Sequence, residues 1–297
     1  MSLYSLQNSF LSIEAVSSGA ELTSIKDRAT GTEYLWNADP SYWSRHAPIL
    51  FPVVGSLKEK SYTYQGKSYS LPQHGFARDM EFTLTSQTET ELWFALEANA
   101  TTRKVYPFEF RLELGYRLEG PKVTALWRVT NTGKETMHFS IGGHPAFLCP
   151  PGSSHKQSDC YLSFDTEKPL RYLLVNEHGL EVKMPKEEQY VLNTNHGIVS
   201  IDSHMFDQDA LIIEEHQCHQ VSLLDASRKP YLKVTFDAPL FGLWSPAGKQ
   251  APFVCIEPWY GRCDASDFQG TLEERDYNNT LGAAETFEEA YSIEVLF

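Results

Sequence analysis

Alternation of apolar and polar residues at every second position is the strongest constraint on the fold of this chain. In FEFRLELGYRL, residues 108–118, every second residue from Phe108 to Leu118 is aliphatic or aromatic. KVTALWRVT, residues 122–130, repeats the pattern, and the intervening EGPK is a turn signal. A period of two places alternate side chains on opposite faces of a strand. The two segments therefore predict a β-hairpin of long strands with one buried face.

Shorter alternating runs recur along the chain, bounded by Gly, Pro and Asn. Helical patterns occur at residues 271–278 and 283–291, where two short helices are expected. No linker, shift in composition or internal repeat divides the sequence. We therefore predict an all-β fold with one domain over residues 1–297, a large antiparallel β-sandwich. The polar segment 150–196 is expected to be a long excursion from the sheets.

Charge and cysteine content limit the partners and the compartment. The formal net charge of -14 argues against nucleic acid or an anionic membrane as a partner. The five cysteines lack CxxC spacing, which favours reduced thiols over a disulfide framework. The N-terminus lacks the signal-peptide pattern, and no apolar run has the length of a membrane helix. We expect a soluble, cytoplasmic protein that is a monomer or homodimer.

Three segments break the alternating pattern with residues that titrate or bind anions. They are PQHGFARD (residues 72–79), FSIGGHPAF (139–147) and VCIEPWYGRCD (254–264). In the second, Gly142 and Gly143 permit a bend and a close approach of the backbone, and Pro145 forbids a regular ladder. The segment is thus a poor strand interior that presents His144. The alternative is that His144 is only a buried, hydrogen-bonded histidine.

Glu257 and Arg78 have alternatives of the same kind. Glu257 follows an apolar run, and Pro258 is expected to end that strand. Partial desolvation raises the pKa of a carboxyl, which suits a general base near neutral pH, although a strand-end carboxylate can also cap a backbone amide. Arg78 can bind an anion, or it can pair with Asp79 at the surface, where such a pair contributes little.

One further segment, EEHQCHQ, is rich in metal-ligand types. It contains Glu214, His216, Cys218 and His219. On a strand, His216 and Cys218 share a face while His219 points away, so the spacing fits only a turn. We expect no metal at His216 and His219. The chain also lacks the metalloprotease, nucleophile-elbow, phosphate-loop and dinucleotide fingerprints, and no cofactor is expected.

Taken in order, three stretches resemble the aldose 1-epimerase (galactose mutarotase-like) superfamily, and within it the LacX-type branch of the lactose and galactose operons. They are APILFPVVGSLKEKSYTYQGKSYSLPQHGFARD (residues 47–79), GGHPAF (142–147) and CIEPWYG (255–261). The resemblance covers nearly the full chain. It implies a β-supersandwich and an enzyme that interconverts the α and β anomers of a hexose without a cofactor or metal.

The resemblance also implies roles for individual residues. Glu257 matches the general base of the family, and His144 matches its general acid. His74 matches a second histidine near the ring oxygen of the sugar. Asp209 is the better match to an aspartate that binds a ring hydroxyl, and Asp207 is the neighbour with which it could be confused.

One departure from the family pattern leaves the substrate open. Galactose mutarotases have an Asn-Arg pair where this chain reads Gly55-Ser56. Arg45 and Arg78 are expected to supply the positive charge instead, and arginines at similar positions flank an anion in the related hexose-6-phosphate mutarotases. Three hypotheses remain: a mutarotase for free aldoses, the same chemistry on a sugar phosphate, and a non-catalytic carbohydrate-binding protein with aromatic platforms such as Trp259. In each, the partner is a small-molecule sugar or sugar phosphate.

Overall fold

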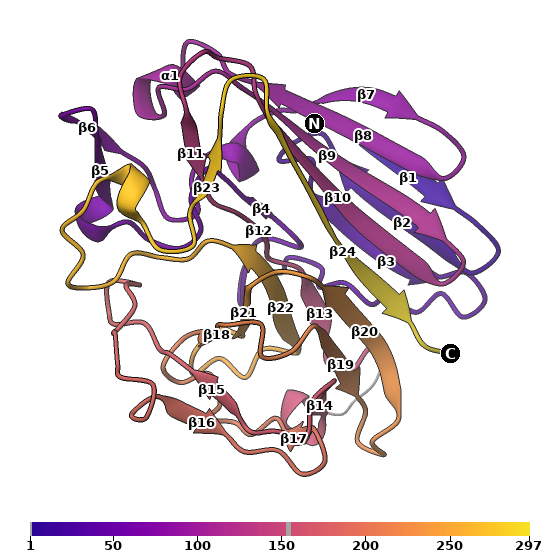
Figure 1. Ribbon diagram of the computed structural model, residues 1–297. Coiled ribbons are helices and arrows are strands. Elements are labelled where there is room, and N and C mark those ends of the chain that lie inside the picture. Colours follow the sequence, from indigo (N-terminus) through magenta and orange to yellow (C-terminus); the bar gives the residue numbers. More distant parts are fainter. Residues whose placement is uncertain (1, 153–155) are drawn as a thin grey trace.

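The computed structural model describes residues 2–152 and 156–297, and the regular structure in these ranges is almost entirely β (Figure 1). The helical elements in the described ranges are one short α-helix and four 3-10 turns. They are α1 (Thr102–Val105), η1 (Lys58–Lys60), η2 (Ala77–Asp79), η3 (Gln157–Asp159) and η4 (Leu272–Glu274). None of the described helices has the length and apolar character needed to cross a membrane.

Two large sheets carry most of the fold, and every ladder between named strands is antiparallel. The nine-stranded sheet has the order β17 (Ile198–Ser200), β14 (Tyr161–Phe164), β19 (Gln220–Leu224), β20 (Pro230–Phe236), β24 (Thr286–Val295), β10 (Lys122–Asn131), β9 (Phe110–Glu119), β8 (Glu91–Glu97) and β7 (Thr83–Gln87). The six-stranded sheet contains β18 (Leu211–Ile213), β21 (Leu240–Trp244), β22 (Phe253–Tyr260), β12 (Ile141–Gly143) and β4 (Ile49–Leu50), with β13 (Ala146–Leu148) also paired to β22.

Smaller sheets complete the structure. A three-stranded sheet is formed by β1 (Leu3–Gln7), β2 (Leu11–Val16) and β3 (Leu22–Asp27). Three two-stranded sheets pair β5 (Ser61–Tyr64) with β6 (Lys67–Ser70), β11 (Met137–Phe139) with β23 (Asn279–Leu281), and β15 (Leu170–Tyr172) with β16 (Tyr190–Leu192).

Aromatic side chains fill the space between the layers. Phe236 of β20 lies 5.1 Å from Phe241 of β21, ring centroid to ring centroid, so it joins the nine-stranded sheet to the six-stranded one. Trp127 of β10 and Tyr260 of β22 also join the two sheets, with an edge-on contact between rings whose centroids are 6.3 Å apart. The hydroxyl of Tyr116 on β9 donates to the carbonyl of Ala20, next to β3. These contacts confirm the expected antiparallel sandwich.

The long hairpin is formed as predicted by β9 and β10, with Lys122 opposite Glu119. Residues on β10 alternate strictly between buried and partly exposed, which explains why its pattern could be recognised in the sequence.

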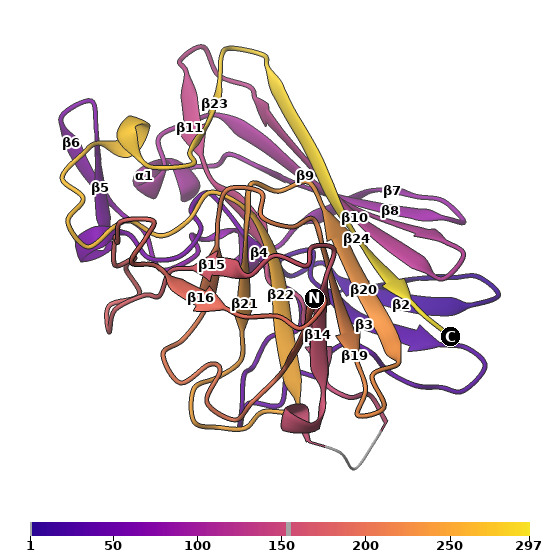
Figure 2. The same ribbon diagram turned by 60° about the horizontal axis from the view of Figure 1, so that its bottom comes forward.

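The helix expected at residues 283–291 is wrong. This segment enters β24, which lies between β10 and β20, as both views show (Figures 1 and 2). Tyr291, Ile293 and Val295 are buried there at alternate positions, so burial on two flanking strands overrides the helix propensity of its Ala and Glu residues. At residues 271–278 only the short turn η4 forms.

The segment 150–196 is a partial excursion. Residues 153–155 lie outside the described residues. Further along, β14 enters the nine-stranded sheet beside β19, which the polar composition did not indicate. The hairpin β15–β16 stays outside the two large sheets, and Val175 and Gly179 reach a cavity described below.

Candidate active site

Glu257 lies in the interior of β22, in which all eight residues are buried. The expectation that Pro258 ends this strand is wrong, because Pro258 pairs with Phe241 of β21 and the strand continues to Tyr260. The backbone of Glu257 is therefore fixed, because the residues before and after it in β22 are paired with β21. Its side chain is 1% exposed.

His144 projects from the break between β12 and β13. Its amide donates to Pro48 (3.1 Å), while the amide of Ile256 on β22 donates to Pro145 (3.3 Å). The next residue of β22 that turns toward this break is Pro258, which has no N–H to donate. The ladder is thus open beside His144, and the residue is free to leave the plane of the sheet.

Gly142 and Gly143 make room for aromatic rings. Both lie in β12, but this strand ends at Gly143 and the next begins at Ala146, so the expected interruption of the strand falls at His144 and Pro145. A Cβ at Gly142 would lie 2.5 Å from Cδ1 of Trp259, and one at Gly143 would lie 3.0 Å from the ring of Tyr291. The close approach expected from the sequence is present at both glycines, where the backbone lies directly against the rings of Trp259 and Tyr291.

His74 is fixed by its own turn. It has a positive φ of 65°, and its Nδ1 accepts a hydrogen bond from the amide of Gly55 (3.1 Å). The ring proton of neutral His74 therefore lies on Nε2, which is then a donor. Burial, followed by the nearby His144, lowers the pKa of His74 well below its usual range. A Cβ at Gly55 would lie 2.5 Å from Cβ of Cys263, so no larger residue fits at that position without displacement.

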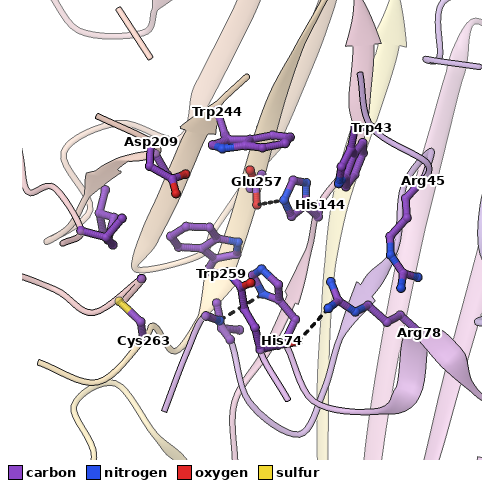
Figure 3. A pocket seen from close by; sticks show the side chains of 17 residues that line it. Trp43, Arg45, His74, Arg78, His144, Asp209, Trp244, Glu257, Trp259 and Cys263 are labelled. Atoms are coloured by element: carbon purple, nitrogen blue, oxygen red, sulfur yellow. Dashed lines mark hydrogen bonds and ion pairs between the residues drawn. The ribbon is translucent and has the colours of Figure 1, made fainter. Parts of the chain in front are cut away.

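His144 and Glu257 face each other across 3.3 Å, from Nε2 to Oε2 (Figure 3). Burial raises the pKa of the Glu257 carboxyl well above its usual range, and the charge of Asp209 raises it further. Burial lowers the pKa of His144 to about 3. Both shifts favour the uncharged arrangement of the pair, a protonated carboxyl beside a neutral imidazole.

Two of the polar atoms in this pair lack hydrogen bonds. Among the described residues, buried Nδ1 of His144 has no hydrogen-bond partner, and buried Oε2 of Glu257 makes no hydrogen bond of good geometry beside its 3.3 Å contact with Nε2 of His144. Buried polar atoms without partners are costly unless something else satisfies them. The arrangement is therefore suited to a polar ligand.

Tryptophans hold the imidazole of His144 in place. Trp43 stacks on it with centroids 4.7 Å apart and planes 26° apart, and Trp244 meets it edge-on at 5.3 Å. Trp259 is the aromatic platform expected from the sequence, whereas no sequence pattern identified Trp43 and Trp244. The available signal was weak: Trp43 is an aromatic residue within the polar stretch SYWSRH.

Two arginines lie at the same cavity. Arg45 donates to the carboxylate of Asp79 (2.8 Å), and Arg78 donates to the carbonyl of Gln73 (2.8 Å). Nε of Arg78 forms a long ion pair with Asp79 (3.8 Å), too far for a hydrogen bond, and this buried atom has no hydrogen-bond partner among the described residues. Burial lowers the pKa of Arg78 to about 10, with Arg45 acting in the same direction, so the Arg78 guanidinium stays charged near neutral pH.

The predicted residues converge on one cavity of about 330 Å³ (Figure 3). Its lining includes all six predicted site residues and the three tryptophans: Glu257, His144, His74, Arg78, Asp209, Arg45, Trp43, Trp244 and Trp259. Asp207, the neighbour of Asp209, is instead paired with His204 (2.7 Å) and does not line the cavity. The volume lies at the small end of the range for small-molecule sites, about 300–1,000 Å³.

Two groups of side chains in the described residues could hold a metal ion. One is His144, Cys255 and Glu257, of which His144 and Glu257 line the cavity, and the other is His216, His219 and Asp237, which do not line it. All five cysteines are buried and free.

Comparisons with known proteins agree with this arrangement. Residues 2–269 match the protein family described as aldose 1-epimerase. The chain is similar to the chromosomal and plasmid LacX proteins of Lactococcus lactis subsp. lactis, with 33% identity over 299 residues that cover 98% of this chain and 98% of each relative.

Solved structures share the fold. A galactose mutarotase related enzyme from Lactobacillus acidophilus is 34% identical and superposes with a TM-score of 0.93. The match covers 100% of this chain and 98% of the chain of that enzyme. A galactose mutarotase-like protein from Lactobacillus casei ATCC 334 is 27% identical, with coverage of 99% of this chain and 100% of its own and a TM-score of 0.90. The expected galactose mutarotase-like β-supersandwich is confirmed.

Proposed function

Because the chain belongs to the aldose 1-epimerase family, we propose that it interconverts the α and β anomers of a hexose by acid/base opening and closing of the sugar ring. The contact between Glu257 and His144 inside the cavity carries this proposal. Anomer exchange requires one group to take the proton of the C1 hydroxyl and another to protonate the ring oxygen. A carboxyl and an imidazole that face the same space meet this requirement.

The two opposed pKa shifts fit a complete proton cycle. Burial favours protonated Glu257 with neutral His144. The charged form, a carboxylate beside an imidazolium, has the same number of protons and acts on the cyclic sugar. Glu257 takes the C1 hydroxyl proton, His144 gives its proton to the ring oxygen, and the C1–O5 bond breaks to leave the aldehyde. The pair is then uncharged, rotation about C1–C2 follows, and the reverse transfers close the ring as the other anomer.

Neighbouring residues fit the roles of substrate contacts. The Nε2–H of His74 is a fixed donor for the ring oxygen, because its Nδ1 is engaged by Gly55. Asp209 is an acceptor for a ring hydroxyl at the cavity wall. The indole of Trp259 offers an apolar face to a sugar.

Replacement of Glu257 tests the proposal. Glu257→Gln keeps the shape of the side chain but cannot accept the proton, so we expect turnover to fall by about 10²–10⁴-fold while sugar affinity changes only a few-fold. Exchange NMR spectroscopy of the anomers of a panel of hexoses measures turnover, and calorimetry measures binding. Glu215→Gln is the control, because Glu215 is an exposed residue that pairs with Lys186 outside the cavity.

Retention of most of the wild-type rate in Glu257→Gln would assign the base to another carboxyl. Tight sugar binding by the wild type without faster anomer exchange would favour the alternative of a non-catalytic carbohydrate-binding protein.

A hexose phosphate is the second candidate substrate, because two arginines reach the cavity and Nε of Arg78 has no hydrogen-bond partner among the described residues. Hydroxyls of a neutral hexose do not need a guanidinium group, whereas phosphate oxygens match its planar fork. Asp79 neutralises part of this positive charge, because its carboxylate forms an ion pair with Arg45.

Arg78→Ala separates the two substrates. For a hexose 6-phosphate we expect the KM to rise at least tenfold, about 1.4 kcal/mol, with little change for free hexose. Equal losses on both substrates would give Arg78 a structural role and favour free aldoses.

A further inference from the structure

Two imidazoles and one carboxylate that are distant in sequence meet on the surface outside the cavity. His216 follows β18, His219 directly precedes β19, and Asp237 directly follows β20. We propose that His216, His219 and Asp237 form a binding site for one divalent transition-metal ion, with Zn²⁺ as the representative.

The ligand atoms have the separation that such an ion requires. One ligand atom from each residue lies within 4.8 Å of the other two, and the imidazole centroids are 5.4 Å apart. Nδ1 of His219 and Oδ1 of Asp237 are 3.6 Å apart, which is too long for a hydrogen bond. Zinc–ligand distances of about 2.0–2.2 Å in a tetrahedron place neighbouring ligand atoms roughly 3.3–3.6 Å apart. Nδ1 of His219 is also buried and has no hydrogen-bond partner among the described residues.

The backbone of the site is fixed by hydrogen bonds. His216 donates to the carbonyl of Pro239 (3.0 Å), and Phe236 donates to the carbonyl of His219 (3.0 Å). The amide of His219 also donates to the carboxylate of Asp165 (3.1 and 3.3 Å). These bonds hold both histidines beside the end of β20, so an ion would bind side chains whose backbone is already placed.

The geometry removes the reason for expecting no metal here. That expectation assumed a strand, on which His216 and His219 point to opposite sides. Glu215 and His216 both have positive φ, 65° and 50°, so the chain turns between β18 and β19 and brings the two rings together. Cys218 is 3% exposed and belongs to the core, and it is not among the three ligands.

The chemistry of the ligands selects the class of ion. Two imidazoles with one carboxylate suit Zn²⁺, Ni²⁺ or Cu²⁺, whereas Mg²⁺ and Ca²⁺ prefer sites made of oxygen. A bound ion would tie β18 of the six-stranded sheet to β19 and β20 of the nine-stranded sheet. Asp209 and Ala210, which precede β18, line the cavity, so the ion would also secure one wall of the candidate active site.

Zinc binding to the untagged, metal-stripped full chain tests the proposal. We expect one Zn²⁺ per chain by calorimetry and elemental analysis, and a rise in the Tm. His216→Gln and His219→Gln should each weaken binding at least tenfold and abolish the Tm shift, and Asp237→Asn should weaken it less. His204→Gln is the matched control, because His204 is an exposed histidine that also faces one carboxylate, that of Asp207.

Each other result overturns the proposal. The proposal fails if the wild type takes up no Zn²⁺ in excess metal, or if the His216 and His219 variants keep wild-type affinity. Loss of the ion in His144→Gln with retention in His216→Gln would place it in the cavity, at the other group of ligand types.

Discussion

At the residue scale, the candidate site depends on burial, which shifts the pKa values of Glu257 and His144 in opposite directions. Burial raises the pKa of Glu257 and lowers that of His144, because desolvation disfavours the charged form of each. The pair must hold one proton to act in the proposed cycle. Activity is therefore expected between the lowered pKa of His144 and the raised pKa of Glu257, and it is lost when the pair gains a second proton or loses its only one.

Asp209→Asn is expected to shift the alkaline limb of this pH profile. The charge of Asp209 raises the pKa of Glu257, so its removal lowers that pKa. The pair then loses its proton at a lower pH, and the alkaline limb of kcat/KM moves to lower pH. Asp207→Asn is the control, because Asp207 faces His204 and should leave the limb in place. A shift toward higher pH in Asp209→Asn would contradict the assigned coupling.

At the element scale, β22 and β12 place the site because their packing leaves room for one large ring. Trp259 of β22 lies against Gly142 of β12 on one side and Gly242 of β21 on the other, and a Cβ at either glycine would lie 2.5 Å from the indole. The three strands therefore determine the position of the indole at the cavity wall. Pro258, which lies inside β22, leaves the ladder open where His144 departs.

Gly142→Ala tests this packing. Its Cβ would overlap the Trp259 indole, and overpacking of a buried site costs about 1–3 kcal/mol of the free energy of unfolding. Displacement of Trp259 should also weaken sugar binding. Gly282→Ala is the control, because its closest neighbour is the carboxylate end of the flexible Glu285 side chain, at 3.2 Å. Urea denaturation and ligand titration give both quantities, and equal stability of the two variants would argue against a rigid contact.

At the scale of the whole molecule, a buried ion pair lies where the segment after β22 contacts the turn η1. Arg275 is 5% exposed, and it donates to the carboxylate of Asp264 (2.6 Å) and the carbonyl of Arg262 (2.8 Å). Asp264 in turn accepts from the amide of Lys58 (2.9 Å), at the start of η1. The bond between Lys58 and Asp264 thus connects two segments that are 206 residues apart in the chain.

Arg275→Ala is expected to lower the free energy of unfolding by about 3–5 kcal/mol, because it leaves the buried Asp264 carboxylate without its partner. Arg103→Ala is the matched control: Arg103 and Glu109 form an arginine–carboxylate pair in which both side chains are 45% exposed, and its loss should cost at most about 1 kcal/mol. Thermal and urea unfolding of the two variants measure the difference. Similar losses would show that the Arg275 pair is not structurally special.

Local sequence patterns predicted the β class of the fold and its longest hairpin, and they identified the residues of the candidate site. Alternation along β9 and β10 records the burial of one face, which is a local property, and the resemblance to a family singled out Glu257, His144 and His74 before any geometry was known. The tertiary structure decided what depends on distant partners. Flanking strands made residues 286–295 a strand, stacking placed Trp43 on His144, and a turn brought His216 beside His219. Such contacts leave no periodic pattern, because each joins residues whose separation along the chain is set by the whole fold.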